Sequence, residues 1–329
     1  MLGAIHAAVW THLAERMREA VEQWVESLPA HRANVELGSM LRGGYPFAIC
    51  WTFTTPKIRA TWAFGEVSAL ASTLTVSSQI WHPDTLLINA NGLMLSVDHR
   101  SSRDHWYVEA STGSWTFGPA IPQGTFELRF DFVDVAAGLG GLPRTQPLLA
   151  GANMVEGTVR FTRSPDDGPH QTIGMNLEGV SSPLSNQISL QDFGMVRIEA
   201  SLHGSPGDLS LEDIVDWRDS GGILDITHLE IEWPPIEVFL DGTITLDERI
   251  RPMGAGTVDV RGANALIDHQ VALGHLTHGQ ATAVKLALAV MTRPAKDGGE
   301  PTVQTSITAQ GGQLQVGPFT IARLSSLIR

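Results

Sequence analysis

Cysteine and lysine are scarce in this chain of 329 residues, and basic residues as a group are outnumbered by acidic ones. The single cysteine, Cys50, excludes an internal disulfide and any zinc or iron–sulfur site built from cysteines. Because its neighbours in YPFAICWTF are apolar, we expect a buried, inert thiol. The 22 Lys and Arg against 35 Asp and Glu give a net charge of −13, which would repel a phosphate backbone. Nucleic acid is therefore a poor candidate for a partner.

The short motifs that carry common chemistries are also missing. The chain contains no GxSxG elbow, no GxxxxGK[ST] phosphate loop and no HExxH helix. The best metal candidate is DHQVALGHLTHG, with Asp268, His269, His275 and His278, in which the last two could share a helical face. Gly274 and the lack of a fixed third ligand favour solvated or core histidines instead. We therefore expect no enzyme, no metal and no cofactor, and a metal hydrolase is the least favoured alternative.

No apolar run at the N-terminus is long enough to cross a bilayer, which takes roughly 20 residues. The run MLGAIHAAVW has no basic residue ahead of it and continues into one amphipathic helix within residues 1–29, which Pro29 ends. Apolar residues recur every three or four positions, at Ile5, Val9, Leu13, Met17, Val21, Trp24 and Leu28.

Two interpretations of this helix remain open. Its apolar stripe could pack on its own protein, as most such stripes do. Alternatively, Leu2 to Trp10 is the end of a membrane anchor or signal segment, and we then expect the reading frame to continue upstream into a longer hydrophobic segment. The helix is net acidic, so charge does not favour its adhesion to an anionic lipid surface.

Beyond Pro29, apolar and polar residues alternate, most clearly in FELRFDF and VFLDGTITLD. A period of two predicts strands with one apolar and one wetted face, and the Gly, Pro, Asn and Asp between runs favour antiparallel meanders. Tryptophans in or beside these strands could be core anchors or could line an apolar ligand surface. An open apolar face could bind lipid, and the candidate groove residues are Phe126, Leu128, Phe130, Phe132, Val238, Leu240, Ile244 and Leu246.

Helices interrupt the strands. One is expected to begin at Ser210 and to end at Gly221 or Gly222, and two more are expected within residues 264–291, separated near Gly274. The stretch IEWPPIEVFLDGTITLD echoes the earlier IWHPDTLLINANGLMLSVD, and a strand led by Gly and closed by Gly-Pro follows each.

The expected fold is mainly β with a few helices (α+β), in which antiparallel curved sheets form two related lobes. The first lobe would cover residues 30–205, and the second, with inserted helices, residues 206–329. Chance similarity of turn residues is the alternative explanation of the echo.

Several framework stretches resemble a known family. GGYPF, and the run WRDSGGILDITHLEIEWPPIEVFLDGTITLDERIRPMGAGTVDVRG leading to GGQLQVGPFTIARL, are similar to DUF2125, a domain of unknown function in envelope proteins of alphaproteobacteria. The similarity covers nearly the whole chain and is strongest over Trp217 to Leu324. Members usually begin with a hydrophobic export or anchor segment, and the resemblance implies that this chain starts inside such a segment. The resemblance implies a periplasmic protein, tethered to the inner membrane, and no catalytic residues.

A looser similarity links the Gly-closed strands to the groove-forming strands of AsmA-like envelope proteins, which are associated with lipid movement. We therefore expect a non-catalytic, membrane-tethered envelope protein whose apolar sheet groove takes lipid or another amphiphile. The alternative is a periplasmic scaffold that binds partner proteins through exposed strand edges. A continuous apolar concavity would favour the first function, and a filled core with flat exposed edges would favour the second.

Overall fold

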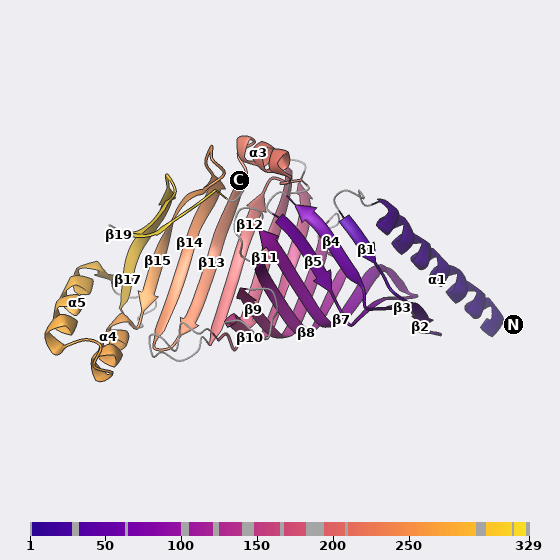
Figure 1. Cartoon of the computed structure of the whole chain (residues 1–329), viewed down its shortest axis with the longest axis horizontal. Coiled ribbons are helices and arrows are strands. Elements are labelled where there is room, and N and C mark those ends of the chain that lie inside the picture. The colour runs from indigo at the N-terminus through magenta and orange to yellow at the C-terminus, as the bar shows by residue number, and fades with distance from the viewer. Residues whose placement is uncertain are drawn as a thin grey trace. The chain divides into compact units, whose positions relative to one another are not determined.

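The computed structural model describes residues 2–27, 33–62, 65–99, 105–120, 125–139, 148–164, 168–181, 194–207, 210–293, 301–317 and 319–326. In these ranges the protein is mostly antiparallel strand, with four helices (Figure 1). The expected mainly β, antiparallel fold with a few helices is confirmed.

The chain forms two compact units. The first is Met1–Pro165 with Leu209–Leu211 and Arg329, and the second is Asp166–Asp208 with Glu212–Ile328. This boundary lies about 40 residues before the expected one at residue 205. Strand pairing explains the shift, because β11 (Gly168–Glu178) pairs with β12 (Met195–His203) and β12 pairs with β13 (Ile223–Trp233). The turn residues near 205 therefore connect elements inside the second unit.

The first unit is an antiparallel sheet preceded by one helix. Its strands are β1 (Ala33–Glu36), β2 (Met40–Gly43), β3 (Ala48–Thr54), β4 (Lys57–Trp62), β5 (Gly65–Leu70), β6 (Thr73–Gln79), β7 (His82–His99), β8 (His105–Ala120), β9 (Thr125–Leu139) and β10 (Leu148–Ser164). The short strands lie end to end and form longer, interrupted strands. β1 pairs with β4 and β2 with β3, while β3 pairs with β6 and β4 with β5. Next to them, β5 and β6 pair with the two halves of β7.

The interruptions line up across the sheet. They fall around Gly38, Thr55 and Ser72, and hydrogen bonds link them: the Thr55 N–H donates to the Ser72 carbonyl (2.9 Å), and the Ser72 N–H donates to the Asn91 carbonyl (2.8 Å). Gly38, Thr55 and the β7 residue Gly92 have φ angles of 67°, 47° and 58°. Such left-handed residues bend a strand and shift its side chains by one position.

The bend continues into β9, where Asp134 has a φ of 52° and lies between the residues that pair with Glu109 and Thr112 of β8. We call this line of bends, marked by Gly38, Thr55, Gly92 and Asp134, the crease. Because neighbouring strands bend at the same level, their apolar side chains stay on one face on both sides of the crease.

The N-terminal helix α1 (Leu2–Ser27) is continuous, as expected, and packs on the sheet of the first unit (Figure 1). In the part of the chain that the structure describes, no helix combines the length and apolar character needed to cross a membrane. The buried residues of α1 are Trp10 and Ala14, which join Ile49, Trp51 and Phe53 of β3 in the core of this unit.

The helix stripe differs in detail from the predicted one. Leu13, Met17 and Val21 pack against the core as expected, whereas Ile5 and Val9 are exposed. The face that meets the sheet is centred on Trp10 and Ala14, and Ile5 and Val9 lie outside it. Leu28 and the side chain of Trp24 lie outside the described residues.

Cys50 is half-buried rather than buried. The core side of β3 is formed by Ile49, Trp51 and Phe53, so alternation places Cys50 on the other side of the strand.

The second unit is also an antiparallel sheet. Its further elements are α3 (Leu211–Asp219), β14 (Ile236–Leu246), β15 (Pro252–Arg261), α4 (Ala263–Ala272), α5 (His278–Met291), β16 (Thr292–Arg293), β17 (Thr302–Gln310), β18 (Gln313–Val316) and β19 (Phe319–Arg323). The strands pair in chain order from β11 to β15, then β15 pairs with β17, β17 with β18 and β18 with β19.

The helices of this unit match the sequence prediction. The first begins just after Ser210 and is released before Gly221, whose φ is 81°. The other two are separated around Gly274, with a φ of 76°, and a capping box of Thr277 and Gln280 starts the second of them.

The echo in the sequence corresponds to a hairpin. Trp81 lies in the turn that leads into β7, and Trp233 ends β13 just before β14. Beyond the hairpin the two copies pair differently, because β8 pairs with β7, whereas β18 pairs with β17 and β19. The common feature of the two copies is thus the Trp-Pro turn and the strand that follows it.

Asp247 holds the turn between β14 and β15. Its carboxylate accepts hydrogen bonds from the N–H groups of Arg249 (2.8 Å) and Arg251 (2.9 Å) and from Nε of Arg251 (2.8 Å). Burial opposes the charged form, but the hydrogen bonds from Arg251 and Arg249 outweigh it, so that the pKa of Asp247 lies below its ordinary value.

We expect Asp247→Asn to lower the free energy of unfolding at pH 7 by about 1.5–3 kcal/mol, the usual range for hydrogen bonds to a charged group. A lowered pKa in the folded state stabilises the fold above the unfolded pKa of about 3.9, and this contribution is lost as the pH falls further. Urea unfolding at pH 7 and pH 3 should therefore show a difference between the two proteins that shrinks in acid. The exposed Asp219→Asn is the control and should change little at either pH.

Candidate functional site

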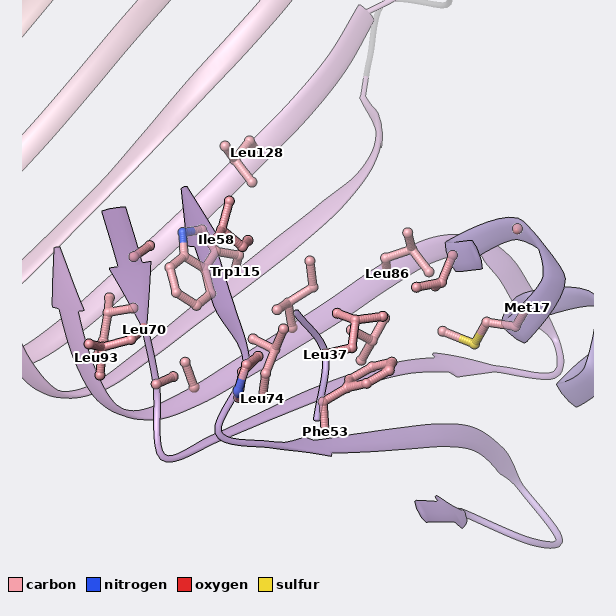
Figure 2. Close-up of a pocket in the computed structure, with 18 residues that line it drawn as sticks. Met17, Leu37, Phe53, Ile58, Leu70, Leu74, Leu86, Leu93, Trp115 and Leu128 are labelled. Carbon is pink, nitrogen blue, oxygen red and sulfur yellow. The ribbon is translucent and has the colours of Figure 1, made fainter. Parts of the chain in front are cut away.

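The crease of the first unit borders a cavity of about 630 Å³ (Figure 2). All eighteen residues that line it are apolar. Strands on both sides of the crease contribute, and the helix α1 closes one side with Met17, Ala20 and Val21. The strand contributors include Phe53, Ile58, Ala69, Leu74, Ala90, Leu93, Trp115 and Leu128.

The bends explain how these residues meet. Phe53 and Ile58 are five positions apart, as are Ala69 and Leu74, so in a straight strand each pair would point to opposite faces. The interruption between them shifts the side chains by one position, and both members of each pair line the same cavity. Residues at the bends themselves, Leu37, Pro56 and Ala71, belong to the lining as well.

Small side chains leave the space open. Ala69, Ala71 and Ala90 lie on neighbouring parts of the lining, where larger apolar residues would occupy the volume. Ala71 and Ala90 are themselves buried.

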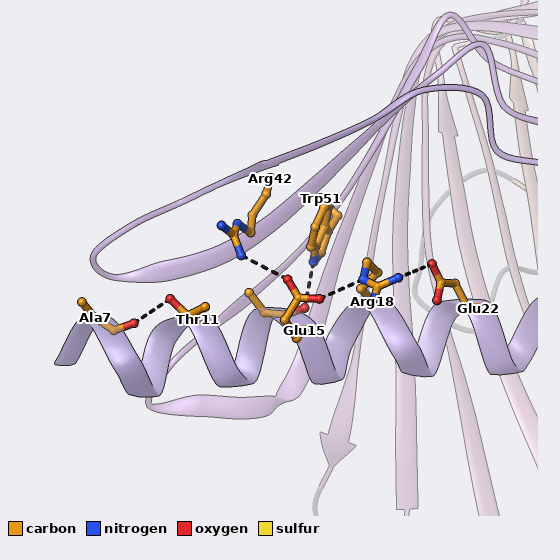
Figure 3. Close-up of polar contacts among 8 residues, drawn as sticks. Ala7, Thr11, Glu15, Arg18, Glu22, Arg42 and Trp51 are labelled. Atoms are coloured by element: carbon orange, nitrogen blue, oxygen red, sulfur yellow. Dashed lines mark hydrogen bonds and ion pairs between the residues drawn. The ribbon is translucent and has the colours of Figure 1, made fainter. Parts of the chain in front are cut away.

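The helix that closes the cavity is held by its N-terminal half. Nε1 of Trp10 donates to the Ala48 carbonyl (2.6 Å), and Nε1 of Trp51 donates to the Ala14 carbonyl (3.1 Å). Glu15 pairs with Arg42 of β2 at 3.2 Å (Figure 3). The cavity-lining residues Met17, Ala20 and Val21 follow immediately, so the anchored part positions the part that covers the cavity.

Charged groups lie on the other side of the strands. Glu127, next to Leu128 in β9, pairs with Nε of Arg160 (2.7 Å) and with Arg129. The hydrogen bond from Arg160 holds the pKa of Glu127 below its ordinary value against the effect of burial, and Arg129 adds to it. The eighteen lining residues themselves include no acid, base, nucleophile or metal ligand. Such a lining can hold an apolar group.

The structure places one of the predicted β9 residues in the lining, Leu128. The other three lie on the same face of the strand by alternation. Phe126 is exposed and stacks on Phe117 (5.9 Å between ring centroids), while Phe132 contacts Trp115 edge-on (5.3 Å) and Phe130 at 5.6 Å. Trp115 joins the lining, whereas Trp51 belongs to the core.

The four predicted β14 residues, Val238, Leu240, Ile244 and Leu246, belong to the second unit. They share one face of the strand and are half-buried, and their cross-strand partners include Ile231, Leu229, Val260 and Val258. These residues form an apolar sheet face in that unit, distinct from the lining of the cavity in the first unit.

The structure separates the two histidines that the sequence could have placed on one helical face. His275 lies in the connection between α4 and α5, whereas His278 is the first residue of α5, so the two do not share a helical face. His275 Nδ1 is 2.9 Å from Oε1 of Gln270, and Asp268 pairs with Lys285 at 2.6 Å. Within the described ranges, no group of three or more His, Cys, Asp or Glu residues could hold a metal ion.

Most of the lining was not singled out from the sequence. Alternation in TLTVSSQIW does place Leu74 and Val76 on one strand face, which is the only local signal for them. Ile58, Ala69 and Leu93 reach the lining only because the strands bend. The isolated glycines and Thr55 at these bends form no sequence pattern that would have predicted them.

Comparison with known proteins identifies a family and nothing further. A family model described as an uncharacterized protein conserved in bacteria (DUF2125) matches residues 10–325, nearly the whole chain. No curated protein sequence and no solved structure gives a significant match.

Proposed function

The chain belongs to the DUF2125 family of uncharacterised bacterial proteins, and from the geometry of its first unit we propose that it is a non-catalytic protein that binds the alkyl chain of a lipid or another amphiphile. The observation that carries the proposal is the cavity of about 630 Å³ whose eighteen lining residues are all apolar. Small-molecule sites usually measure roughly 300–1,000 Å³, and this cavity lies within that range.

An alkyl chain is the ligand that such a lining favours. Each buried methylene group contributes about 0.8 kcal/mol, and the lining side chains carry no charge and, apart from the indole N–H of Trp115, no polar group. A charged or strongly polar ligand would lose its hydration without compensation. The charged end of an amphiphile would therefore remain in water while its chain enters the cavity.

The proposal includes a place in the cell. A periplasmic protein tethered to the inner membrane fits the apolar, uncharged start of α1, Leu2 to Trp10, and would meet amphiphiles at a membrane.

Filling the cavity tests the proposal. Ala69→Phe adds an aromatic ring to the lining, so we expect it to weaken binding of a fluorescent fatty acid at least about tenfold, or about 1.4 kcal/mol, without unfolding the protein. Fluorescence titration combined with a melting curve measures both effects. The matched control is Ala255→Phe, an exposed strand alanine of the second unit, which should bind like the wild type.

A wild type that never binds the fatty acid would contradict the proposal, and so would a folded Ala69→Phe variant with unchanged affinity. Equal weakening by Ala69→Phe and Ala255→Phe would show that the effect does not arise in the cavity.

One observation favours the scaffold as a second candidate. All five residues of β19 are exposed, Phe319 by 71% and Ile321 by 58%, and the described pairings give this strand one neighbour, β18. An exposed strand of this kind can pair with an extended segment of another protein. Native mass spectrometry of protein extracted gently from its own cells separates the two candidates, because a lipid and a protein subunit add very different masses.

A further inference from the structure

We propose that the N-terminal end of α1 and the turns beside it form a docking surface for a zwitterionic phospholipid bilayer. The surface, called here the aromatic patch, consists of Tyr45, Phe47 and Trp81 together with Ile5 and Val9. These large apolar residues are exposed by 53%, 65%, 57%, 57% and 46%, respectively.

Contacts connect the members of the aromatic patch into one surface. Tyr45 contacts the rings of His6 (5.8 Å) and Trp10 (5.5 Å), which follow Ile5 and Val9 on α1 by one residue each. On its other side, the ring of Phe47 contacts the ring of Trp81 at 6.1 Å. The turn with Tyr45 and Phe47 is thus joined by ring contacts to His6 and Trp10 of α1 and to Trp81, and Ile5 and Val9 are the exposed neighbours of those helix residues in the chain.

The local framework keeps these groups in place. Nε2 of His6 lies 2.8 Å from the Pro46 carbonyl oxygen, between the two aromatic residues of the turn. The Ile80 N–H donates to the Phe47 carbonyl at 3.3 Å, which joins this turn to the one that carries Trp81. Trp10 itself is buried and donates to the Ala48 carbonyl. These hydrogen bonds fix the backbone that carries the exposed rings, so the rings are held at the surface.

The chemistry of the aromatic patch matches the interface of a bilayer. Tyr and Trp combine an apolar ring with one polar atom, and such residues gather where hydrocarbon meets the headgroups. Ile5, Val9 and Phe47 add apolar groups that can reach the acyl boundary. A protein partner would also accept aromatic groups, but such interfaces add a polar rim with direct hydrogen bonds, and the basic group beside the patch, Arg42, is already paired with Glu15.

Charge decides the kind of bilayer. No member of the patch is charged, and the basic group beside it, Arg42, lies over the Trp10 ring at 5.3 Å and pairs with Glu15. With a net charge of −13, the whole chain would be repelled by anionic lipids. Zwitterionic lipids avoid this repulsion, and binding by insertion of apolar groups is insensitive to salt.

The docking surface extends the proposed function by naming the membrane that would supply the amphiphile. Only this role in supplying lipid rests on the proposed function. Ile5 and Val9 of the aromatic patch lie in the N-terminal half of α1, and Met17, Ala20 and Val21 in its other half line the cavity. A bilayer bound at the patch would lie against the helix that covers the cavity. An alkyl chain that moves from the bilayer into the cavity would have to pass beside this helix.

Flotation with phosphatidylcholine vesicles tests the docking surface. We expect the full chain to float with the vesicles equally at about 0.1 M and 0.5 M salt, where exposed charges are screened over about 10 Å or less. The double variant Phe47→Ser with Trp81→Ser should reduce the bound fraction at least about tenfold, or about 1.4 kcal/mol. The control is Trp106→Ser with Phe319→Ser, which removes two other exposed aromatic groups (46% and 71%) outside the patch and should float like the wild type.

Each remaining outcome has a defined meaning. A wild type that does not float, a patch variant that floats unchanged, or binding that 0.5 M salt removes would overturn the docking surface. A concentration-dependent dimer that the patch variant abolishes would also overturn it and assign the patch to a second copy of the chain. Binding of the fluorescent fatty acid in vesicle-free solution reports separately on the cavity, so a patch variant that binds the fatty acid normally yet fails to float supports the docking surface.

Discussion

Phe53→Ala is expected to lower the free energy of unfolding by about 3–5 kcal/mol, the range for removing a large aromatic side chain from a core. Phe53 is exposed by only 1% and is the largest fully buried side chain among the described residues. It packs in the core cluster with Trp10 and Trp51 and also borders the cavity. Its removal would enlarge an existing space rather than allow the sheet to collapse, so relaxation can recover little of the lost contact.

Urea unfolding followed by tryptophan fluorescence measures this effect, because Trp10 and Trp51 are part of the same cluster. The control is Phe319→Ala, the same substitution at a residue exposed by 71%, which should stay within about 0.5 kcal/mol of the wild type. A loss of this size is a substantial part of a total stability of about 5–15 kcal/mol. A loss equal to that of the control would mean that α1 does not pack on β3 as described.

Leu128→Asp is expected to weaken binding of the fluorescent fatty acid roughly 100-fold, or about 2.7 kcal/mol, while the protein stays folded. Leu128 lines the cavity and is half-buried, so water can reach the new carboxylate as long as the cavity is empty. An alkyl chain in the cavity would displace that water, and the free energy of desolvating the charge would oppose binding.

The matched control is Leu240→Asp in β14, which introduces the same charge on the apolar face of the second unit. If the cavity of the first unit holds the ligand, this variant should bind the fatty acid as the wild type does. Loss of binding in Leu240→Asp with retention in Leu128→Asp would move the ligand to the second unit. A Leu128→Asp variant that fails to fold would show that the position is core, and Ala69→Phe would then carry the test of the cavity.

Local elements of this protein could be predicted because the physics that forms them is local. The period of three or four in residues 1–29 predicted α1, and the alternation in FELRFDF and VFLDGTITLD predicted β9 and β14. Gly274, which adopts a left-handed conformation with little strain, marked the break between α4 and α5. Family membership also followed from the sequence, since framework Gly, Trp and Pro residues extend over nearly the whole chain.

Tertiary structure decided which of the apolar faces encloses a cavity. Of the eight candidate residues, Leu128 lines it, and the four in β14 lie in another unit, because alternation shows that a face is apolar but not what lies opposite. The helix face was decided in the same way: Ile5 and Val9 fit the helical period as well as Leu13 does, but the face that meets β3 lies around Trp10.

The sequence by itself therefore determined the mainly β fold, the helices, the apolar strand faces and the absence of the catalytic motifs sought. The crease, and with it the cavity, was decided only by the tertiary structure. A residue such as Thr55 adopts its φ of 47° because strands on both sides bend at the same level and hydrogen-bond across the bend. That alignment is a relation among Gly38, Thr55, Gly92 and Asp134, which lie far apart in the chain, and no local pattern of residues encodes it.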